Sequence, residues 1–220
     1  MPTTKINLNQ KTMLRKLSLI LVLTFAFLGL SAQETQAVEG RDIVDYISVP
    51  GPIKIGDNEY FLYWSKKNSA TWFQQKYLRS DDDYDNYQEL INLSFYNKEI
   101  DIEEAVRKKV ESLQNRKTQV NDNYSFVDVI ESPDGKEIIV DYLVTIVPKE
   151  GAGEAYAEYN IDRFRPTKNG DQNGFLIYTY SKRFYSSDFR GTAKYINKQR
   201  NKMLDRVITT PMPNIKLTGK

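Results

Sequence analysis

The sequence contains no cysteine and no histidine among its 220 residues. Without an imidazole or a thiolate, a chain cannot build a Ser-His-Asp triad, a cysteine nucleophile, an iron-sulfur cluster, haem ligation through these side chains or the usual zinc site. No disulfide can form either. These absences exclude most familiar catalytic constellations, and we expect neither a resident metal nor a cofactor.

The first 32 residues are typical of a secretory signal peptide. Four basic residues precede an uncharged and mostly apolar run at 17–30, and small or polar residues follow it. The run of 14 residues is shorter than the roughly 20 that span a bilayer as a helix, so an uncleaved anchor is the alternative. We expect cleavage after Ala32, or alternatively after Ala37, with Met13 as an alternative start. The product should be periplasmic or secreted.

The positive charge of the whole chain belongs to this segment. The chain has 31 basic and 29 acidic residues. Without the four basic residues of the signal, 27 basic residues stand against 29 acidic ones, a formal net charge of −2. A strong basic excess is typical of proteins that bind nucleic acid or membrane surfaces. We therefore expect no nucleic acid as partner and no stable membrane span after signal cleavage.

Hydrophobic periodicity predicts a lead-in segment at 33–50 and one α+β domain at 51–220. Alternating or aromatic-rich runs predict strands at 60–66, 70–78, 87–95, 124–131, 137–147, 155–165 and 175–185. A helical period predicts helices at 100–116, with Asp101 as N-cap, and at 187–207. Short connections make the sheet antiparallel. We expect an antiparallel β-sheet of about six to seven strands covered by two main helices.

The order of these elements resembles that of the PsbP/Mog1-like α+β sandwich. The resemblance is carried by residues 52–64, by Gln-Lys-Tyr-Leu at 75–78 leading through an acidic loop to Asn-Tyr-Gln-Glu-Leu at 86–90, and by the helix that follows Phe95. It covers most of the chain after the signal. That family consists mainly of binding and assembly factors, so the resemblance implies such a role and no catalytic residues.

An acidic loop offers one candidate metal site. Asp81, Asp83 and Asp85 alternate as the oxygen ligands of a calcium loop do. The sixth position of the loop is Asn86 instead of glycine, and the twelfth is Asn92 instead of a bidentate glutamate. The sequence therefore favours a solvated acidic turn over weak calcium binding.

A second acidic group lies on an expected strand. Glu154, Glu158 and Asp162 recur every four residues, which places them on one face of a strand with Asn160. This face is either a binding surface or an ordinary exposed polar face, and the pattern favours the second. A pair of catalytic carboxylates requires a separation that sequence does not supply.

The candidate ligand or partner surface combines aromatic and basic side chains. Aromatic rings on strands offer contact area with a polar handle, although core packing explains them equally. Basic residues on the expected last helix recur every fourth position, with Arg206 as the last, and a solvated face is the alternative interpretation. The candidate residues are Trp64, Trp72, Tyr77, Tyr178, Tyr180, Arg190, Lys194, Lys198 and Lys202.

Export, the missing catalytic side chains and the aromatic strands predict a non-enzymatic binding or assembly module of the bacterial cell envelope. Its partner would be an envelope protein or a small ligand. The alternatives are a secreted hydrolase or lyase that uses carboxylates alone and a secreted interaction protein. Two facing buried carboxylates in a cleft would favour the enzyme, whereas an exposed patch would favour binding.

Overall fold

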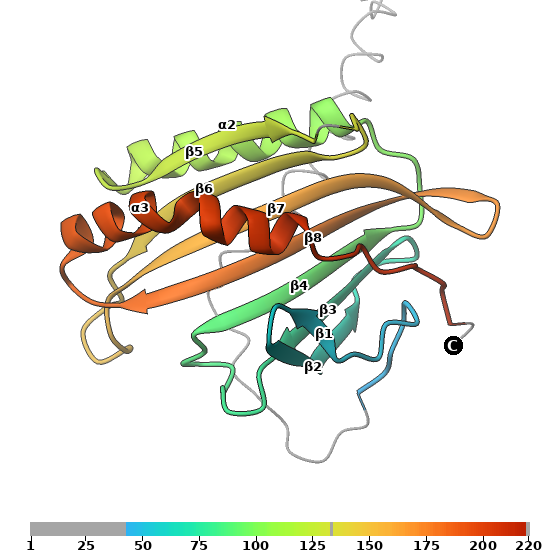
Figure 1. The fold of residues 1–220 in the computed structure, drawn as a ribbon, viewed down its shortest axis with the longest axis horizontal. Coiled ribbons are helices and arrows are strands. Elements are labelled where there is room, and N and C mark those ends of the chain that lie inside the picture. Colours follow the sequence, from blue (N-terminus) through green and yellow to red (C-terminus); the bar gives the residue numbers. More distant parts are fainter. Residues whose placement is uncertain (1–42, 133, 219–220) are drawn as a thin grey trace, which may run out of the picture. The chain divides into compact units, whose positions relative to one another are not determined.

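The computed structural model describes residues 43–132 and 134–218, so the predicted signal peptide lies outside the described residues. The elements in chain order are β1 (Ile53–Ile55), β2 (Asn58–Lys67), β3 (Trp72–Leu78), β4 (Glu89–Tyr96), α2 (Ile102–Gln119), β5 (Phe126–Glu131), β6 (Ile138–Ile146), β7 (Tyr156–Asn169), β8 (Gln172–Tyr185) and α3 (Phe189–Ile208) (Figure 1). Both expected helices and all seven expected strands are present, with ends that differ by a few residues.

The strands form one antiparallel sheet in the order β1-β2-β3-β4-β8-β7-β6-β5, curved into a half-barrel. The expectation of six to seven strands is therefore wrong, because the described part of the chain has eight. The missed strand is β1, whose three residues are too few to show a period. It pairs with β2 across a turn at Gly56 and Asp57, where Gly56 has a φ of 58° that glycine adopts without steric cost.

The hairpin of β7 and β8 is longer than expected. Each strand has 14 residues, and pairing continues to Asn169 opposite Gln172, so the expected strands at 155–165 and 175–185 are too short at the turn between them. The pairing of β6 with β7 ends at Phe164. Pro166 therefore lies where β7 has no β6 neighbour, and its missing N–H costs no hydrogen bond on that side.

The two helices cover opposite faces of the sheet (Figure 1). Arg163 of β7 donates hydrogen bonds from Nη1 to the carbonyl oxygens of Val207 and Thr210, at the end of α3, at 3.0 and 2.6 Å. The preceding residue, Asp162, pairs instead with Lys109 of α2 at 2.9 Å. Because neighbouring side chains of a strand point to opposite faces, the sheet has an α3 face and an α2 face.

The main core lies on the α3 face. Strand residues of this core include Tyr60, Phe73, Tyr77, Ile91, Leu93, Phe95, Ile139, Leu143, Tyr159, Ile161, Leu176, Tyr178 and Tyr180, and α3 adds Ile196, Leu204 and Val207. Ile47 and Val49 also belong to it, so the expected lead-in segment contributes to the core. The tail after α3 is fixed here as well, because the Lys216 N–H donates to the Ile47 carbonyl oxygen at 3.1 Å.

The sheet ends at β1 on one side and at β5 on the other. In β5, Asp128 Oδ1 accepts a hydrogen bond from the Val129 N–H at 3.0 Å, and Asp128 Oδ2 pairs with Arg200 of α3 at 2.6 Å. None of the helices in residues 43–132 and 134–218 combines the length and the apolar character that a bilayer span requires.

Candidate functional site

The outer side of α3 carries four exposed basic residues. They form the basic face of the protein: Arg190, Lys194, Lys198 and Lys202. Each lies about 6 Å further along the helix axis than the previous one. None of the four has an ion-pair partner within the described residues. The opposite side of the helix packs against the sheet through Ile196, Leu204 and Val207, so α3 has an apolar side and a basic side.

The charges of α2 are arranged differently. Its first turn carries Glu103 and Glu104, which suit the positive end of the helix dipole. Glu104 pairs with Lys108 at 2.8 Å, and Arg107 pairs with Glu111 at 2.6 Å. The first turn of α3 has no acidic residue, and like charges four residues apart repel one another. The basic face therefore lowers the stability of the helix that carries it.

Two other arginines of α3 turn toward the protein. Arg206, which the sequence places at the end of the basic stripe, is partly buried and donates from Nη2 to the Ile55 carbonyl oxygen at 2.7 Å. Arg200 Nε lies 2.6 Å from Oδ2 of the buried Asp141, and this hydrogen bonding raises the pKa of Arg200. The exposed stripe consequently ends at Lys202.

The aromatic candidates divide between the two faces of the sheet. Tyr77, Tyr178 and Tyr180 lie in the main core, with exposed fractions of 0, 0 and 2%. Burial raises the pKa of all three hydroxyls. Because no surface of these rings remains for a ligand, we assign them to core packing. Trp64 and Trp72 lie on the α2 face and are partly buried.

Polar side chains from four adjacent strands gather on the α2 face. They form the polar face: Gln74, Lys76, Asn92, Ser94, Asn160, Asp162, Thr179 and Ser181. The sequence pattern indicated only the members on β7. The signal on the other strands is a polar residue at positions i and i+2, which share one face. Joining the four strands also requires their order in the sheet, which no local pattern supplies.

Hydrogen bonds connect much of the polar face. Gln74 Nε2 donates to Asn92 Oδ1 at 3.1 Å, and Asn92 Nδ2 donates to Ser94 Oγ at 3.3 Å. On the neighbouring strands, Ser181 Oγ donates to Asn160 Oδ1 at 2.5 Å. The polar side chains are thereby held in fixed positions across β3, β4, β7 and β8.

Lys109 of α2 contacts Asp162 and Tyr142 at the border of the polar face. Its Nζ lies 2.9 Å from Asp162 Oδ2 and 2.9 Å from the Tyr142 hydroxyl oxygen. Burial opposes the charge of Lys109, but the attraction of Asp162 and Tyr142 outweighs burial and raises the pKa of Lys109. The other oxygen, Asp162 Oδ1, has no hydrogen-bond partner although only 2% of Asp162 is exposed.

The acidic loop serves a structural role. Asp81 pairs with Arg79 at 2.6 Å. Asp83 Oδ1 accepts hydrogen bonds from the backbone N–H groups of Asp85 and Asn86 at 2.9 and 2.8 Å, which fixes the turn. In the part of the chain that the structure describes, no group of three or more acidic side chains is placed to hold a metal ion.

The acidic residues of β7 are not solvated. Glu158 is 8% exposed, accepts from the Tyr87 hydroxyl at 3.0 Å and pairs with Arg183 Nε at 2.8 Å. Glu154 precedes the strand and is exposed. The interpretation of this face as an ordinary exposed one is therefore wrong, because partners from α2, β8 and the 79–88 loop cover it.

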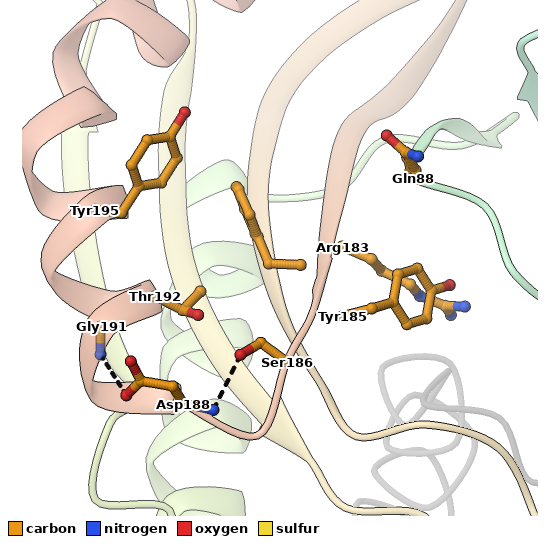
Figure 2. A pocket seen from close by; sticks show the side chains of 9 residues that line it. Gln88, Arg183, Tyr185, Ser186, Asp188, Gly191, Thr192 and Tyr195 are labelled. Atoms are coloured by element: carbon orange, nitrogen blue, oxygen red, sulfur yellow. Dashed lines mark hydrogen bonds between the residues drawn. The ribbon is translucent and has the colours of Figure 1, made fainter.

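A shallow pocket of about 550 Å³ lies where β8 ends and α3 begins. Figure 2 shows Thr192 and Tyr195 of α3 on one side of β8 and Arg183 on the other. Its charged groups are already engaged. Asp188 caps the helix by accepting from the Gly191 N–H at 2.9 Å, and Arg183 is paired with a buried glutamate. We therefore place no ligand in this pocket.

A protein-family model matches residues 47–212 of the chain. The chain belongs to this family. The family is uncharacterised, so membership assigns the domain and no function. All eight strands, both helices, the basic face and the polar face lie inside the matched region. No curated protein and no solved structure matches the chain.

Proposed function

We propose that the protein is an exported, non-enzymatic binding or assembly module of the bacterial cell envelope that docks an anionic partner on the basic face. The observation that carries the proposal is the line of four exposed, unpaired cations on successive turns of α3. Export is supported by the basic and apolar segments at 1–32. The resemblance to PsbP/Mog1-like proteins supports a binding role and remains a prediction.

The energetic cost of the basic face supports a function for it. Charged side chains elsewhere in the fold are commonly matched, as the ion pairs along α2 illustrate. A helix that only needed a solvated outer side would be more stable with acidic residues in its first turn and mixed charges along it. An anionic partner relieves the repulsion between the four cations and is attracted by their combined field.

The buried carboxylates support binding over carboxylate catalysis. Six acidic residues are buried in the described part of the chain, and a basic side chain pairs with every one of them: Glu89, Asp122, Glu137, Asp141, Glu158 and Asp162. A general acid or base works best with a pKa near the working pH. Pairing instead favours the ionised form, and the pKa of Glu89 is about 2.

Retention on a heparin column tests the proposal, with heparin as a defined polyanion. The variant Lys194→Gln/Lys198→Gln/Lys202→Gln should elute at clearly lower salt than the parent. The matched control is Lys98→Gln/Lys149→Gln/Lys168→Gln, because these lysines are also exposed and the net charge changes equally. The control should elute close to the parent.

Equal elution of the two variants would contradict the proposal, since only net charge would then matter. Far-UV circular dichroism should show that both variants keep the parent's fold. Cell fractionation tests the export part separately: recovery of the native protein in the cytoplasm would refute an envelope role, whatever the heparin result.

A further inference from the structure

We infer that the anionic partner of the basic face is the surface of a phospholipid bilayer with acidic headgroups, and this inference rests on the proposed function. The basic face lies on the outer side of α3, whose inner side is packed on the sheet. From Arg190 to Lys202 the helix advances about 18 Å. Acidic headgroups attract clusters of four or more basic side chains on a helix. The contact is peripheral, so α3 stays docked in the fold.

The directions of the four cations favour mobile headgroups over a single chain of fixed charges. Each residue of an α-helix lies about 100° further around the axis, so positions four apart differ by about 40°. From Arg190 to Lys202 the cations therefore spread over about 120° of the helix circumference. A linear polyanion would have to wrap around α3 to meet all four. Lipids diffuse independently, and long basic side chains extend toward the headgroups from the flanks of a helix.

The shape of this surface also fits a bilayer. The outer side of a single helix is convex, and none of the four cations lines the shallow pocket at the start of α3. A polymer or peptide held along its length requires a groove, whereas a flat plane of headgroups does not. Asp205 is the one acidic residue of α3 and follows Lys202. The segment from Arg190 to Lys202 therefore presents cations without an opposing charge.

An exposed tyrosine lies among the cations. Tyr195 stands between Lys194 and Lys198 in the chain, and 53% of it is exposed. A second tyrosine, Tyr124, is 39% exposed, and its ring centre lies 6.2 Å from that of Phe189 in the first turn of α3. Tyrosine is enriched where a bilayer meets water, because its ring is apolar and its hydroxyl is polar. Tyr195 is therefore placed to enter the headgroup layer when the cations bind.

Flotation with lipid vesicles tests the inference. The protein should float with vesicles of phosphatidylcholine and phosphatidylglycerol, but not with vesicles of phosphatidylcholine alone. Added salt should release it, because ions screen exposed charges. The triple glutamine variant of the basic face should bind the acidic vesicles more weakly by about tenfold or more. Its matched control at Lys98, Lys149 and Lys168 should bind close to the parent.

The variant Tyr195→Ser distinguishes a bilayer from other polyanions. It leaves the charge unchanged, so its retention on heparin should match that of the parent. Its affinity for the acidic vesicles should fall by about fivefold or more, because membrane binding increases with the apolar area that enters the interface. The matched control is Phe61→Ser on β2, where the ring is 43% exposed. This control should match the parent in both assays, and circular dichroism should show that both variants keep the fold.

A fluorescent label provides a readout that leaves the cations and Tyr195 in place. The chain has no cysteine, so Asn201→Cys creates a single labelling site on the exposed side of α3. A nitrobenzoxadiazole label there should shift its emission to the blue with acidic vesicles, because the dye leaves water. The same label on Ser69→Cys, in the exposed turn between β2 and β3, should not shift.

Failure of the inference is distinguishable from failure of the proposed function. If the triple variant loses heparin retention but the parent does not float with acidic vesicles, the partner is a soluble polyanion and only the inference is overturned. Equal vesicle affinities of Tyr195→Ser and Phe61→Ser would also overturn it, as would a blue shift at position 69 without one at position 201. Equal elution of the two triple variants from heparin would overturn both proposals.

Discussion

Replacing Ile196 by alanine should destabilise the whole domain. Ile196 is 0% exposed and belongs to the main core, so it anchors the inner side of α3 to the sheet. The substitution removes an ethyl and a methyl group, which is worth ~2.4 kcal/mol at ~0.8 kcal/mol per buried carbon. The cavity left behind adds to this loss. We expect the free energy of unfolding to fall by about 3–4 kcal/mol.

Urea unfolding followed by far-UV circular dichroism measures this effect. The midpoint should fall while the slope of the free energy with urea stays constant, because the surface exposed on unfolding hardly changes. In thermal unfolding, a domain of this size loses roughly 2–4 °C per kcal/mol, so the melting temperature should fall by roughly 6–16 °C.

Asn197→Ala is the matched control, because Asn197 is the next residue of the same helix and is exposed. Its effect should stay within about 0.5 kcal/mol. A loss below about 1 kcal/mol for Ile196→Ala would refute the argument that this side of α3 is packed in the core. The triple glutamine variant of the basic face should leave stability unchanged or slightly raised, because it removes repulsion between like charges.

Two further predictions concern acid stability and the start of the exported chain. Burial opposes ionisation of Glu89, but hydrogen bonds from Lys182 and Tyr60 outweigh it and lower its pKa from 4.5 to about 2. The unfolded chain therefore takes up this proton first, so the contribution of Glu89 is complete above pH 4.5 and is lost as the pH falls toward 2. Glu89→Gln should flatten this acid limb in urea unfolding at a series of pH values, and parallel acid limbs would contradict the argument. Amino-terminal sequencing of the exported protein should begin at Gln33, whereas recovery of an intact 17–30 segment in the membrane would contradict cleavage.

Local sequence patterns predicted the helices and strands that local interactions determine. Asp101 was expected as N-cap of the first helix, and its Oδ1 accepts from the Glu104 N–H at 2.8 Å, which confirms it. The alternating apolar residues of β6 likewise predicted a strand, and this strand pairs with β5. β1 was not predicted, because a strand of three residues is too short to show an alternating pattern. The Gly56-Asp57 turn beside it was nevertheless a usable signal.

The polar face could not be predicted from local sequence patterns, for a different reason. Asp162, Thr179 and Asn92 become neighbours only through the pairing of β7 with β8 and of β8 with β4. The last pairing joins segments about ninety residues apart, and nothing in either segment specifies the other. The roles of the aromatic candidates could not be predicted for a similar reason, because strand propensity places Trp72 and Tyr77 on the same strand without saying that only Tyr77 faces the main core.

The two ends of the sheet determine how the protein behaves when it is concentrated. An open sheet edge invites a strand of another molecule, and long flat edges lead to polymerisation. Here one edge is the three-residue β1, which offers few backbone groups. On the other edge, the Asp128 carboxylate accepts a hydrogen bond from the Val129 N–H and adds a negative charge beside it. Because Arg200 of α3 pairs with that carboxylate, we expect undocking of α3 to release it and to leave this edge open to a strand of another molecule.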